Sequence, residues 1–303
     1  MRTHLVTGAN SGLGLETVRA LAGRNERVIM AVRDLGRGEA ARAELLREHP
    51  RAVLELEQVD LADLDSVRAL GARRLGVDVL INNAGLGTAP LRKTAEGVYA
   101  QFGANHLGHF LLTALLLPQL EEGTDPRVVT VSSGFGRKGR MNLDNLDASQ
   151  GYNQGSAYMQ SKLANALFGA ELDRRLRARG SPVKSVLAHP GVAATPMQQK
   201  PTGWMGVASR AVSALFGRPA ANGALPTLEA ADGAQVSGGE VYGPGKGKND
   251  PARREETWPS MRDLEEARAL WERSEQLTRT RFLSSSGTST PVPGSMNASP
   301  VNP

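Results

Sequence analysis

The sequence predicts an α/β protein with a single doubly wound parallel sheet of about seven strands and helices on both faces of that sheet. Short runs rich in β-branched residues alternate along the chain with longer amphipathic stretches, which is typical of βαβ units. The short runs are apolar at both odd and even positions, as expected for strands that helices cover on both sides. No repeat of fixed period occurs, which argues against a solenoid.

The strands and helices are expected to alternate through most of the chain. The expected strands cover residues 3–8, 27–32, 53–60, 78–85, 127–133, 183–191 and 239–244. The expected helices cover residues 12–24, 36–49, 64–75, 96–120, a stretch around 156–165, and 261–278. The helices between strands serve as the crossovers that parallel pairing requires, and the last helix closes the fold.

Composition limits the classes of function. The chain has 303 residues, of which 40% are hydrophobic and 22% charged, so a core of ordinary size can form. It has no cysteine, which excludes disulfides, thiolate nucleophiles and cysteine-bound metals and suits a cytoplasmic protein. A strand follows Met1 almost directly, so we expect no signal peptide. The apolar run at 110–120 is about half a membrane span, so we expect a buried helix and no integral membrane segment.

The chain carries a net charge of +5 with a pI near 9.7. A basic balance can indicate nucleic-acid binding. Here lysine and arginine are interleaved with acidic residues on helices, which favours solvated helix faces together with a site for an anionic cofactor. We therefore expect a small-molecule substrate and no nucleic-acid partner, and the sequence leaves a homo-oligomer open.

The domain organisation is expected to be one domain over residues 1–283. Residues 284–303 are rich in Ser, Pro, Thr, Gly and Asn, and we expect a disordered tail there. Within the domain, residues 197–220 hold an apolar helix pattern between Gly and Pro residues. That segment is either a lid over a substrate pocket or a helix that covers the core, with a membrane-surface contact as a further alternative.

A glycine turn, "TGANSGLG" at residues 7–14, lies between the first expected strand and helix. Gly8, Gly12 and Gly14 allow a tight turn and let the backbone approach a pyrophosphate at a helix N-terminus. Asn10, Ser11 and Leu13 lie in the same turn. The alternative is a plain strand-to-helix turn, and the position between strand and helix favours dinucleotide binding.

The end of the second strand, "AVRDLGR", bears on the choice of cofactor. Val32 stands where an acidic residue would bind the adenosine ribose hydroxyls. Arg33 follows, with Arg37 about one turn later, and guanidinium groups suit a ribose 2′-phosphate. This favours NADP over NAD. If the strand ends two residues later, Asp34 takes the acidic role and the preference reverses.

Two further strand ends carry polar or small residues. Asp60, followed by Leu61, ends the third strand, where the carboxylate binds the adenine amine or caps the next helix. "NNAG" at residues 82–85 ends the fourth strand, at the edge where wound sheets bind ligands. Asn83, Ala84 and Gly85 there permit close approach of a cofactor, or they form an ordinary Asn/Gly turn.

Tyr158 and Lys162 lie four residues apart in a predicted helix, so both project from one face. Reduction of a carbonyl needs a proton donor near the oxygen, and free tyrosine titrates near 10. A neighbouring ammonium group favours the phenolate and lowers that value. The alternative is an ordinary amphipathic pair.

Together these motifs resemble the short-chain dehydrogenase/reductase family over roughly residues 3–280. The resemblance rests on "TGANSGLG", "NNAG", "ANHLGHF", "VVTVSS", "HPG" and Tyr158-x-x-x-Lys162. "NHLGHFLLT", "SKLAN" and the long gap before Tyr158 are similar to the branch with retinol dehydrogenases, the WW-domain oxidoreductase and protochlorophyllide reductases. The chain departs from that branch in lacking the cysteine of protochlorophyllide reductases and the N-terminal membrane helix of many retinol dehydrogenases.

The resemblance implies a Rossmann-type fold and an enzyme that transfers hydride between NADPH and a carbonyl or alcohol substrate. It implies that Tyr158 donates or accepts the proton and that Lys162 also binds the nicotinamide ribose. It implies that Ser133 polarises the carbonyl, with Ser132 as the fallback. It also implies that Asn105 holds a water linking Lys162 to solvent.

The resemblance completes the expected cofactor site. The residues expected to bind NADP are Gly8, Asn10, Ser11, Gly12, Leu13, Gly14, Arg33, Asp60, Leu61, Asn83, Ala84, Gly85, Tyr158, Lys162, Pro190, Gly191 and Thr195. Thr195 is expected at the nicotinamide carboxamide.

Two alternatives to the leading function stay open. One is an NADPH-dependent C=C reductase of the protochlorophyllide reductase type, and the other is a non-catalytic dinucleotide-binding scaffold. We expect no metal site, because His106 and His109 have no suitable third ligand nearby in sequence.

Overall fold

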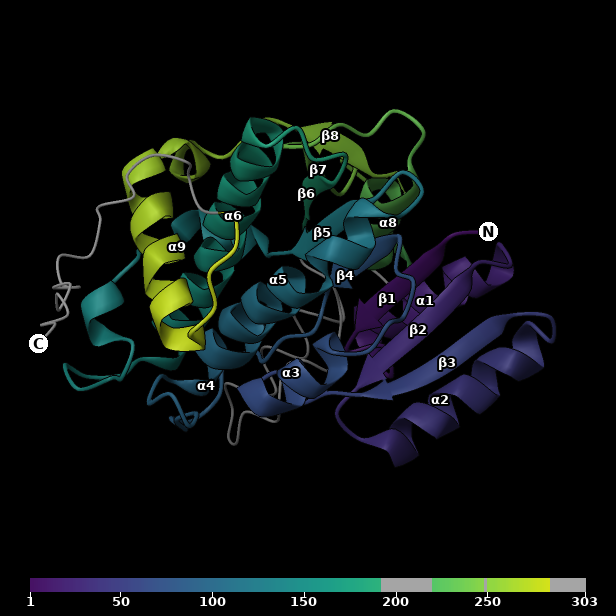
Figure 1. Cartoon of the computed structure of the whole chain (residues 1–303), viewed down its shortest axis with the longest axis horizontal. Helices are drawn as coiled ribbons and strands as arrows, with labels where there is room; N and C mark the ends of the chain where they lie inside the picture. The colour runs from purple at the N-terminus through teal and green to yellow at the C-terminus, as the bar shows by residue number, and fades with distance from the viewer. Residues whose placement is uncertain (192–219, 248–249, 284–303) are drawn as a thin grey trace, which may run out of the picture.

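The computed structural model describes residues 1–191, 220–247 and 250–283, which form one eight-stranded sheet with helices on both faces (Figure 1). The strand order is β3-β2-β1-β4-β5-β6-β7-β8. The strands are β1 (Thr3–Thr7), β2 (Arg27–Val32), β3 (Val53–Gln58), β4 (Val79–Asn82), β5 (Arg127–Val131), β6 (Lys184–Ala188), β7 (Val241–Gly243) and β8 (Arg253–Glu255). All seven expected strands are present, and the expected Rossmann-type doubly wound α/β class is confirmed.

The first seven strands pair in parallel, and the order reverses direction between β1 and β4. Ligands of wound sheets bind outside the carboxyl ends of the strands at such a reversal. The glycine turn after β1 and the "NNAG" turn after β4 therefore meet at the point where a ligand is expected.

The sequence analysis missed the eighth strand. β8 pairs antiparallel with β7 at the edge of the sheet. It is three residues long, reads "RRE" and buries little surface, so it carries none of the apolar pattern that predicts a strand. Short charged strands are a common way to protect a sheet edge from further pairing.

The helices divide between the two faces. One face is covered by α1 (Gly12–Gly23), α2 (Leu35–Glu48) and α8 (Ala220–Asp232). The other is covered by α3 (Leu64–Gly71), α5 (Gly108–Glu121) and α6 (Gln154–Ala178). The short helical segments are α4 (Ala100–Phe102), η1 (Gly103–Leu107), η2 (Gly134–Lys138), η3 (Leu143–Asn145) and η4 (Pro259–Arg262).

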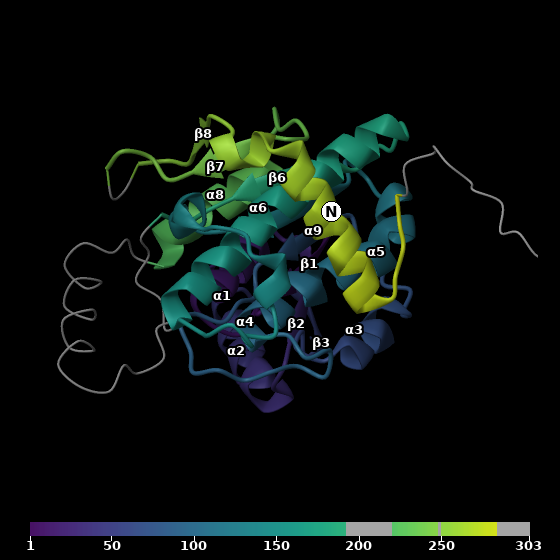
Figure 2. The same ribbon diagram turned by 90° about the vertical axis from the view of Figure 1, so that its left-hand side faces the viewer.

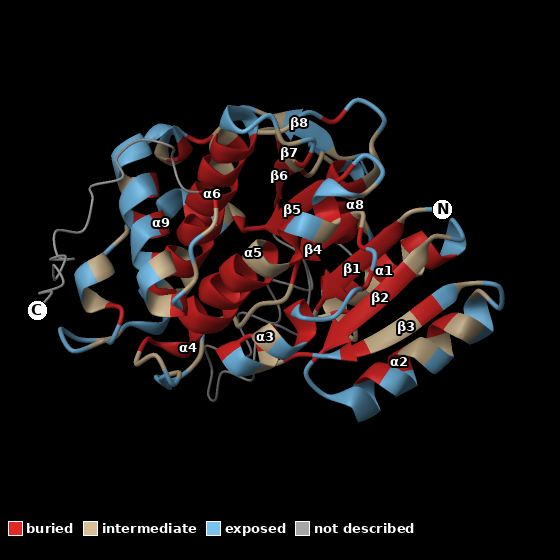
Figure 3. Cartoon of the chain, viewed as in Figure 1, coloured by how far each residue is buried: buried red, intermediate tan, exposed pale blue. Residues whose placement is uncertain are grey.

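Successive residues of a strand point to opposite faces of the sheet and pack into two different hydrophobic clusters. This explains why the strands are apolar at both odd and even positions. Leu5 and Ile29 pack toward α3 and α5, whereas Val6 and Met30 pack toward α1 and α2. Figure 3 shows the central strands buried and the outer side of α2 exposed. The sheet is therefore a buried middle layer between two helical layers.

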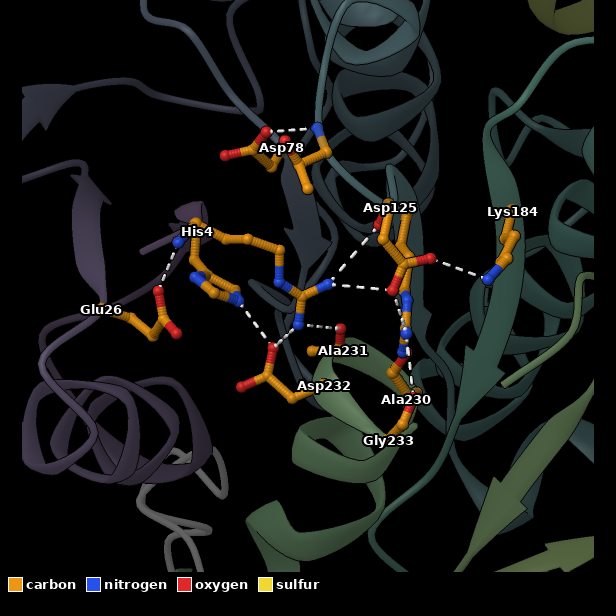
Figure 4. A network of polar contacts seen from close by, with 12 residues as sticks. His4, Glu26, Asp78, Asp125, Lys184, Ala230, Ala231, Asp232 and Gly233 are labelled. Atoms are coloured by element: carbon orange, nitrogen blue, oxygen red, sulfur yellow. Dashed lines mark hydrogen bonds and ion pairs between the residues drawn. The ribbon is translucent and has the colours of Figure 1, made fainter. Parts of the chain in front are cut away.

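The helix α8 was not expected, because its sequence "AANGALPTLEAAD" contains Gly223 and Pro226, which weaken a helix pattern. Its end is bound at the amino-terminal edge of the sheet (Figure 4). There the buried Arg127 donates to the carbonyls of Ala230 (3.0 Å) and Gly233 (2.9 Å), and Asp232 accepts from His4 at 2.8 Å. Tertiary contacts thus stabilise a helix of weak intrinsic propensity.

The last helix, α9 (Leu264–Thr278), packs along α6 on the outside of the molecule (Figure 2). Trp271 stacks near Phe168, with ring centroids 5.8 Å apart, and meets Phe110 edge-on at 5.1 Å. His106 on η1 lies 2.8 Å from the Ser274 hydroxyl. The expected closing helix is therefore an integral part of the core.

Candidate active site

A cavity opens at the carboxyl edge of the sheet, between the turns after β1, β2, β3 and β4. In its glycine turn, Gly8 and Gly12 have positive φ angles of 66° and 55°. A Cβ on Gly14 would lie 2.3 Å from the Gly8 carbonyl oxygen, so the turn and α1 approach too closely for any side chain there. The first backbone N–H groups of α1 consequently lie at the cavity, where an anion would be stabilised.

Most of the predicted cofactor residues line this one cavity. They are Gly8, Asn10, Ser11, Gly12, Leu13, Gly14, Arg33, Asp60, Leu61, Asn83, Ala84 and Gly85. Pro190 and Gly191 follow β6 at the same edge of the sheet. Thr195 and the lid segment up to residue 219 lie outside the described residues, as does the predicted tail. That these residues contact a dinucleotide stays a prediction.

The end of β2 has the register expected from the sequence. The strand ends at Val32, and Arg33 is the first residue beyond it. Asp34 is the N-cap of α2, and its side chain accepts a hydrogen bond from the Arg37 backbone N–H at 3.0 Å. One oxygen of Asp34 is therefore engaged in capping, while Arg33 and Arg37 line the cavity.

Thr7, which the sequence analysis did not single out, holds the "NNAG" turn. Its hydroxyl oxygen accepts hydrogen bonds from the backbone N–H groups of Asn83 and Ala84, both at 2.9 Å. The Asn83 amide in turn donates to the Thr7 carbonyl at 2.8 Å. A threonine at the end of a strand is common, so the sequence alone gives no sign that Thr7 binds the turn after β4. Its contacts are recognised only when β1 and β4 are placed side by side.

His109 connects Thr7 to the segment that carries Asn105. Its Nδ1 lies 3.0 Å from the Asn105 carbonyl oxygen, which can only accept, so Nδ1 carries the proton. Its Nε2 then accepts from the Thr7 hydroxyl at 2.9 Å. Burial lowers the pKa of His109 to about 4, which keeps the ring neutral in this arrangement.

Asn105 is buried in the π-helical turn η1, an element often found at functional sites. Its side-chain oxygen accepts from the Leu86 N–H at 2.6 Å, and its side-chain nitrogen donates to the Leu86 carbonyl at 3.0 Å. The same nitrogen donates to the Ser161 hydroxyl at 2.9 Å. Asn105 thereby joins the turn after β4 to α6.

Lys162 is buried on α6 beside these groups. Its Nζ donates to the Val131 carbonyl at 3.1 Å. A Cβ on Gly85, which lines the cavity, would lie 3.3 Å from both Lys162 Nζ and Asn105 Oδ1, so the three residues adjoin. Burial lowers the pKa of Lys162 to about 8. The amine is therefore mostly charged at neutral pH.

The two serines after β5 have different neighbours. Ser132 donates to the Lys162 carbonyl at 2.7 Å and so helps to hold α6. The Ser133 hydroxyl lies close enough to the Tyr158 phenol to lower its pKa, against the larger effect of burial. Its oxygen also accepts from the Phe135 N–H at 3.3 Å. The structure thus places Ser133 rather than Ser132 beside Tyr158.

The expected lowering of the Tyr158 pKa by Lys162 is not what the structure shows. Burial is the largest effect and raises the pKa of Tyr158, while the Ser133 hydroxyl acts in the opposite direction. The Lys162 ammonium group is directed to the Val131 carbonyl instead. The four-residue spacing correctly predicted that Tyr158 and Lys162 lie on the same face of one helix. It did not predict the hydrogen-bond partner of the Lys162 ammonium group.

The remaining histidines have separate hydrogen-bond partners. His106 lies by Ser274, and His189 lies 3.0 Å from Glu255 with its other ring nitrogen accepting from the Gly191 N–H at 3.3 Å. Among the described residues, no three His, Asp or Glu side chains form a group that would hold a metal ion.

The strand order and the glycine turn define a dinucleotide-binding protein of the Rossmann type. Residues 2–206 match the family model described as short chain dehydrogenase. Human retinol dehydrogenase 14 is 39% identical over 301 residues, covering 90% of this chain and 85% of its own. Human retinol dehydrogenase 13 is 38% identical, with 91% and 84% covered.

A solved structure is also similar. An uncharacterized protein from Mycobacterium paratuberculosis has a TM-score of 0.77 and 43% identity, over 93% of this chain and 95% of that one. The chain belongs to the short-chain dehydrogenase family and lies in its retinol dehydrogenase branch, so it is an oxidoreductase with a nicotinamide cofactor. No helix among residues 1–191, 220–247 and 250–283 is long and apolar enough to span a bilayer.

Proposed function

We propose that this protein is an NADPH-dependent oxidoreductase that interconverts a carbonyl compound and its alcohol, with Tyr158 as the proton donor or acceptor. The observation that carries the proposal is the position of three side chains at one edge of the sheet. The Ser133 hydroxyl lies near the Tyr158 phenol, and the buried Lys162 lies against Gly85, which lines the cavity. A buried ammonium group is costly, and such groups cluster at functional sites.

The residues present fit a nicotinamide dinucleotide. Lysine has three N–H donors, and among the described residues only the Val131 carbonyl accepts from Lys162. The remaining donors suit the hydroxyls of a nicotinamide ribose lying against Gly85. The glycine turn at the N-terminus of α1 suits the pyrophosphate, and Arg33 and Arg37 suit a 2′-phosphate.

When bound, NADPH supplies the hydride that goes to the carbonyl carbon. The protein residues then control the oxygen. We propose that Tyr158 gives its proton to the developing alkoxide, that the Ser133 hydroxyl donates a hydrogen bond to the same oxygen, and that Lys162 stabilises the phenolate that remains. We propose that Asn105 Oδ1, beside Lys162 Nζ, holds a water through which the proton is replaced.

For the substrate we propose an apolar aldehyde or ketone, or the matching alcohol, of the retinoid type. The similarity to retinol dehydrogenases supports this class. So does Phe135, which lies two residues from Ser133 and exposes 49% of its surface. An apolar ring beside a hydrogen-bonding serine suits a substrate with one polar end. With no cysteine in the sequence, we also propose a cytoplasmic location.

The experiment is a screen of aldehydes and ketones, including retinal, with NADPH and separately with NADH, following the loss of reduced cofactor. We expect alcohol as the product and a preference for NADPH. A saturated carbonyl product would instead show C=C reduction. Cofactor binding without turnover on any of these compounds would favour the scaffold alternative.

A further inference from the structure

Three arginines line the cavity, and they come from three separate segments. Arg33 follows β2, Arg37 lies in the first turn of α2, and Arg92 lies in the loop after β4. Arg33 and Arg92 also lie together in an adjoining hollow with Asp60. The sequence motifs pointed to Arg33 and Arg37, which follow the second strand, but they did not point to Arg92.

None of these three guanidinium groups is paired with a side chain or carbonyl in the part of the chain that the structure describes. By contrast, Arg19 and Arg27 on the same half of the sheet pair with Glu44 and Glu55 at 2.7 and 2.8 Å. Three exposed guanidinium groups that form no ion pair with the described residues leave positive charge at the cavity, where an anionic ligand would be stabilised.

The carboxylates in the cavity are held by backbone groups. Asp34 accepts from the Arg37 N–H, and Asp60 accepts from the Ala62 N–H at 2.9 Å. Both side chains thus shape the turns after their strands. Neither forms an ion pair with Arg92 in the described structure, so the guanidinium groups stay available to a ligand.

The loop that presents Arg92 is fixed at several points. Asn105 binds both backbone groups of Leu86. The Ala89 carbonyl accepts from the Tyr152 hydroxyl at 2.7 Å and from the Gln101 amide at 3.2 Å. The Arg92 carbonyl accepts from the Ala100 N–H at 2.8 Å. The backbone at Arg92 is consequently held in place before any ligand binds.

We propose that Arg92 completes a three-arginine site for the 2′-phosphate of the adenosine ribose and so determines the preference for NADP over NAD. The proposal rests on the proposed function. A phosphomonoester dianion carries about two charges near neutral pH and three acceptor oxygens, which three converging guanidinium groups match.

The test uses two probes that differ only in this phosphate, adenosine 2′,5′-bisphosphate and adenosine 5′-monophosphate, with binding measured by calorimetry. Arg92→Gln is compared with Lys93→Gln, because Lys93 neighbours it, is exposed and does not line the cavity. The control removes the same charge from the same loop and so accounts for long-range electrostatics.

The wild type is expected to bind the bisphosphate at least about tenfold more tightly than the monophosphate. Arg92→Gln should reduce that ratio by roughly tenfold through loss of the bisphosphate alone, and Lys93→Gln should keep it within about twofold. A wild-type preference that survives in Arg92→Gln, or an equal loss for both probes, would overturn the role of Arg92 only. A wild type with no preference would overturn the proposed NADP site itself.

Discussion

Lys162 is the residue at which function and stability conflict. Burial lowers the pKa of the Lys162 amine from 10.5 to about 8. The folded protein therefore binds this proton more weakly than the unfolded chain does. This depressed pKa destabilises the fold at neutral pH, and the penalty disappears as pH rises from about 8 to 10.5. The buried ammonium group therefore has to be explained by function rather than by stability.

We predict that Lys162→Met raises the free energy of unfolding at pH 7 while turnover is lost. A pKa shift of this size corresponds to at most about 3.4 kcal/mol. Asn165 also donates to the Val131 carbonyl at 3.2 Å, so no acceptor is left unpaired. Chemical denaturation at pH 7 and near pH 10 provides the measurement, and the gain should shrink at the higher pH. A variant less stable than wild type at pH 7 would disprove this account of Lys162.

At the scale of single residues, the sequence was sufficient where chemistry depends on residue type and local spacing. The glycine turn, Ser133, Tyr158 and Lys162 were expected together, and the structure brings them to one sheet edge. The contacts of Thr7 and the proposed function of Arg92 were not expected, because both depend on strands and loops that are distant in sequence.

Among the elements, α9 and the residues after it show how far the core extends. Phe282 lies against Trp271, with ring centroids 4.7 Å apart, and the Leu283 carbonyl accepts from the buried Arg175 at 3.0 Å. The sequence predicts that the domain extends through residue 283. Leu283, the last described residue, is buried.

We therefore predict different effects from two truncations. A chain that ends after Leu283 should have the same melting temperature as the full-length protein. A chain ended after Arg281 loses the contacts of Phe282 and Leu283, which should cost about 2–4 kcal/mol and lower the melting temperature by roughly 3–7 °C. Differential scanning calorimetry of the three chains is the measurement. Equal melting of both truncated chains would show that these contacts add nothing, and a loss on removing residues 284–303 alone would show that the tail docks.

The elements that sequence reasoning missed have weak local signals. The strand β8 is charged throughout and pairs only because β7 offers an edge. The helix α8 contains a glycine and a proline, and its end is held from outside the helix by Arg127, which donates to the Ala230 carbonyl, and by His4, which pairs with Asp232. Both are stabilised by tertiary contacts, which a pattern of local hydrophobicity does not record.

At the scale of the whole molecule, buried neutral histidines contribute to the loss of stability in mild acid. Burial lowers the pKa of His106 to about 3 and that of His109 to about 4, and it also lowers the pKa of His189. The unfolded chain binds these protons below about pH 6.5, whereas the folded chain does not. Stability is therefore complete above that pH and falls as the pH drops toward 4.

We predict that the free energy of unfolding falls by about 2.7 kcal/mol per pH unit near pH 5, the slope for two protons, with His189 adding to it. Replacing His106 with leucine should reduce the slope by about half. Denaturant titrations from pH 7 to pH 5 supply the measurement. The difference in slope between the wild type and His106→Leu removes the contribution of carboxylates, which begin to protonate at the lower end of this range. If the free energy of unfolding did not change over this range, His106 and His109 could not be buried and neutral in the folded protein.

The central claim is that Tyr158 transfers the proton in an NADPH-dependent reduction. The most direct measurement compares wild type with Tyr158→Phe for NADPH affinity and for turnover of a carbonyl substrate that the wild type reduces. The variant removes one oxygen and keeps the ring, so it should bind NADPH with nearly unchanged affinity and lose about 10²–10⁴ in turnover. A Tyr158→Phe variant that turns over like the wild type would contradict the claim, because the helix that carries Tyr158 and Lys162 would then have no part in the chemistry.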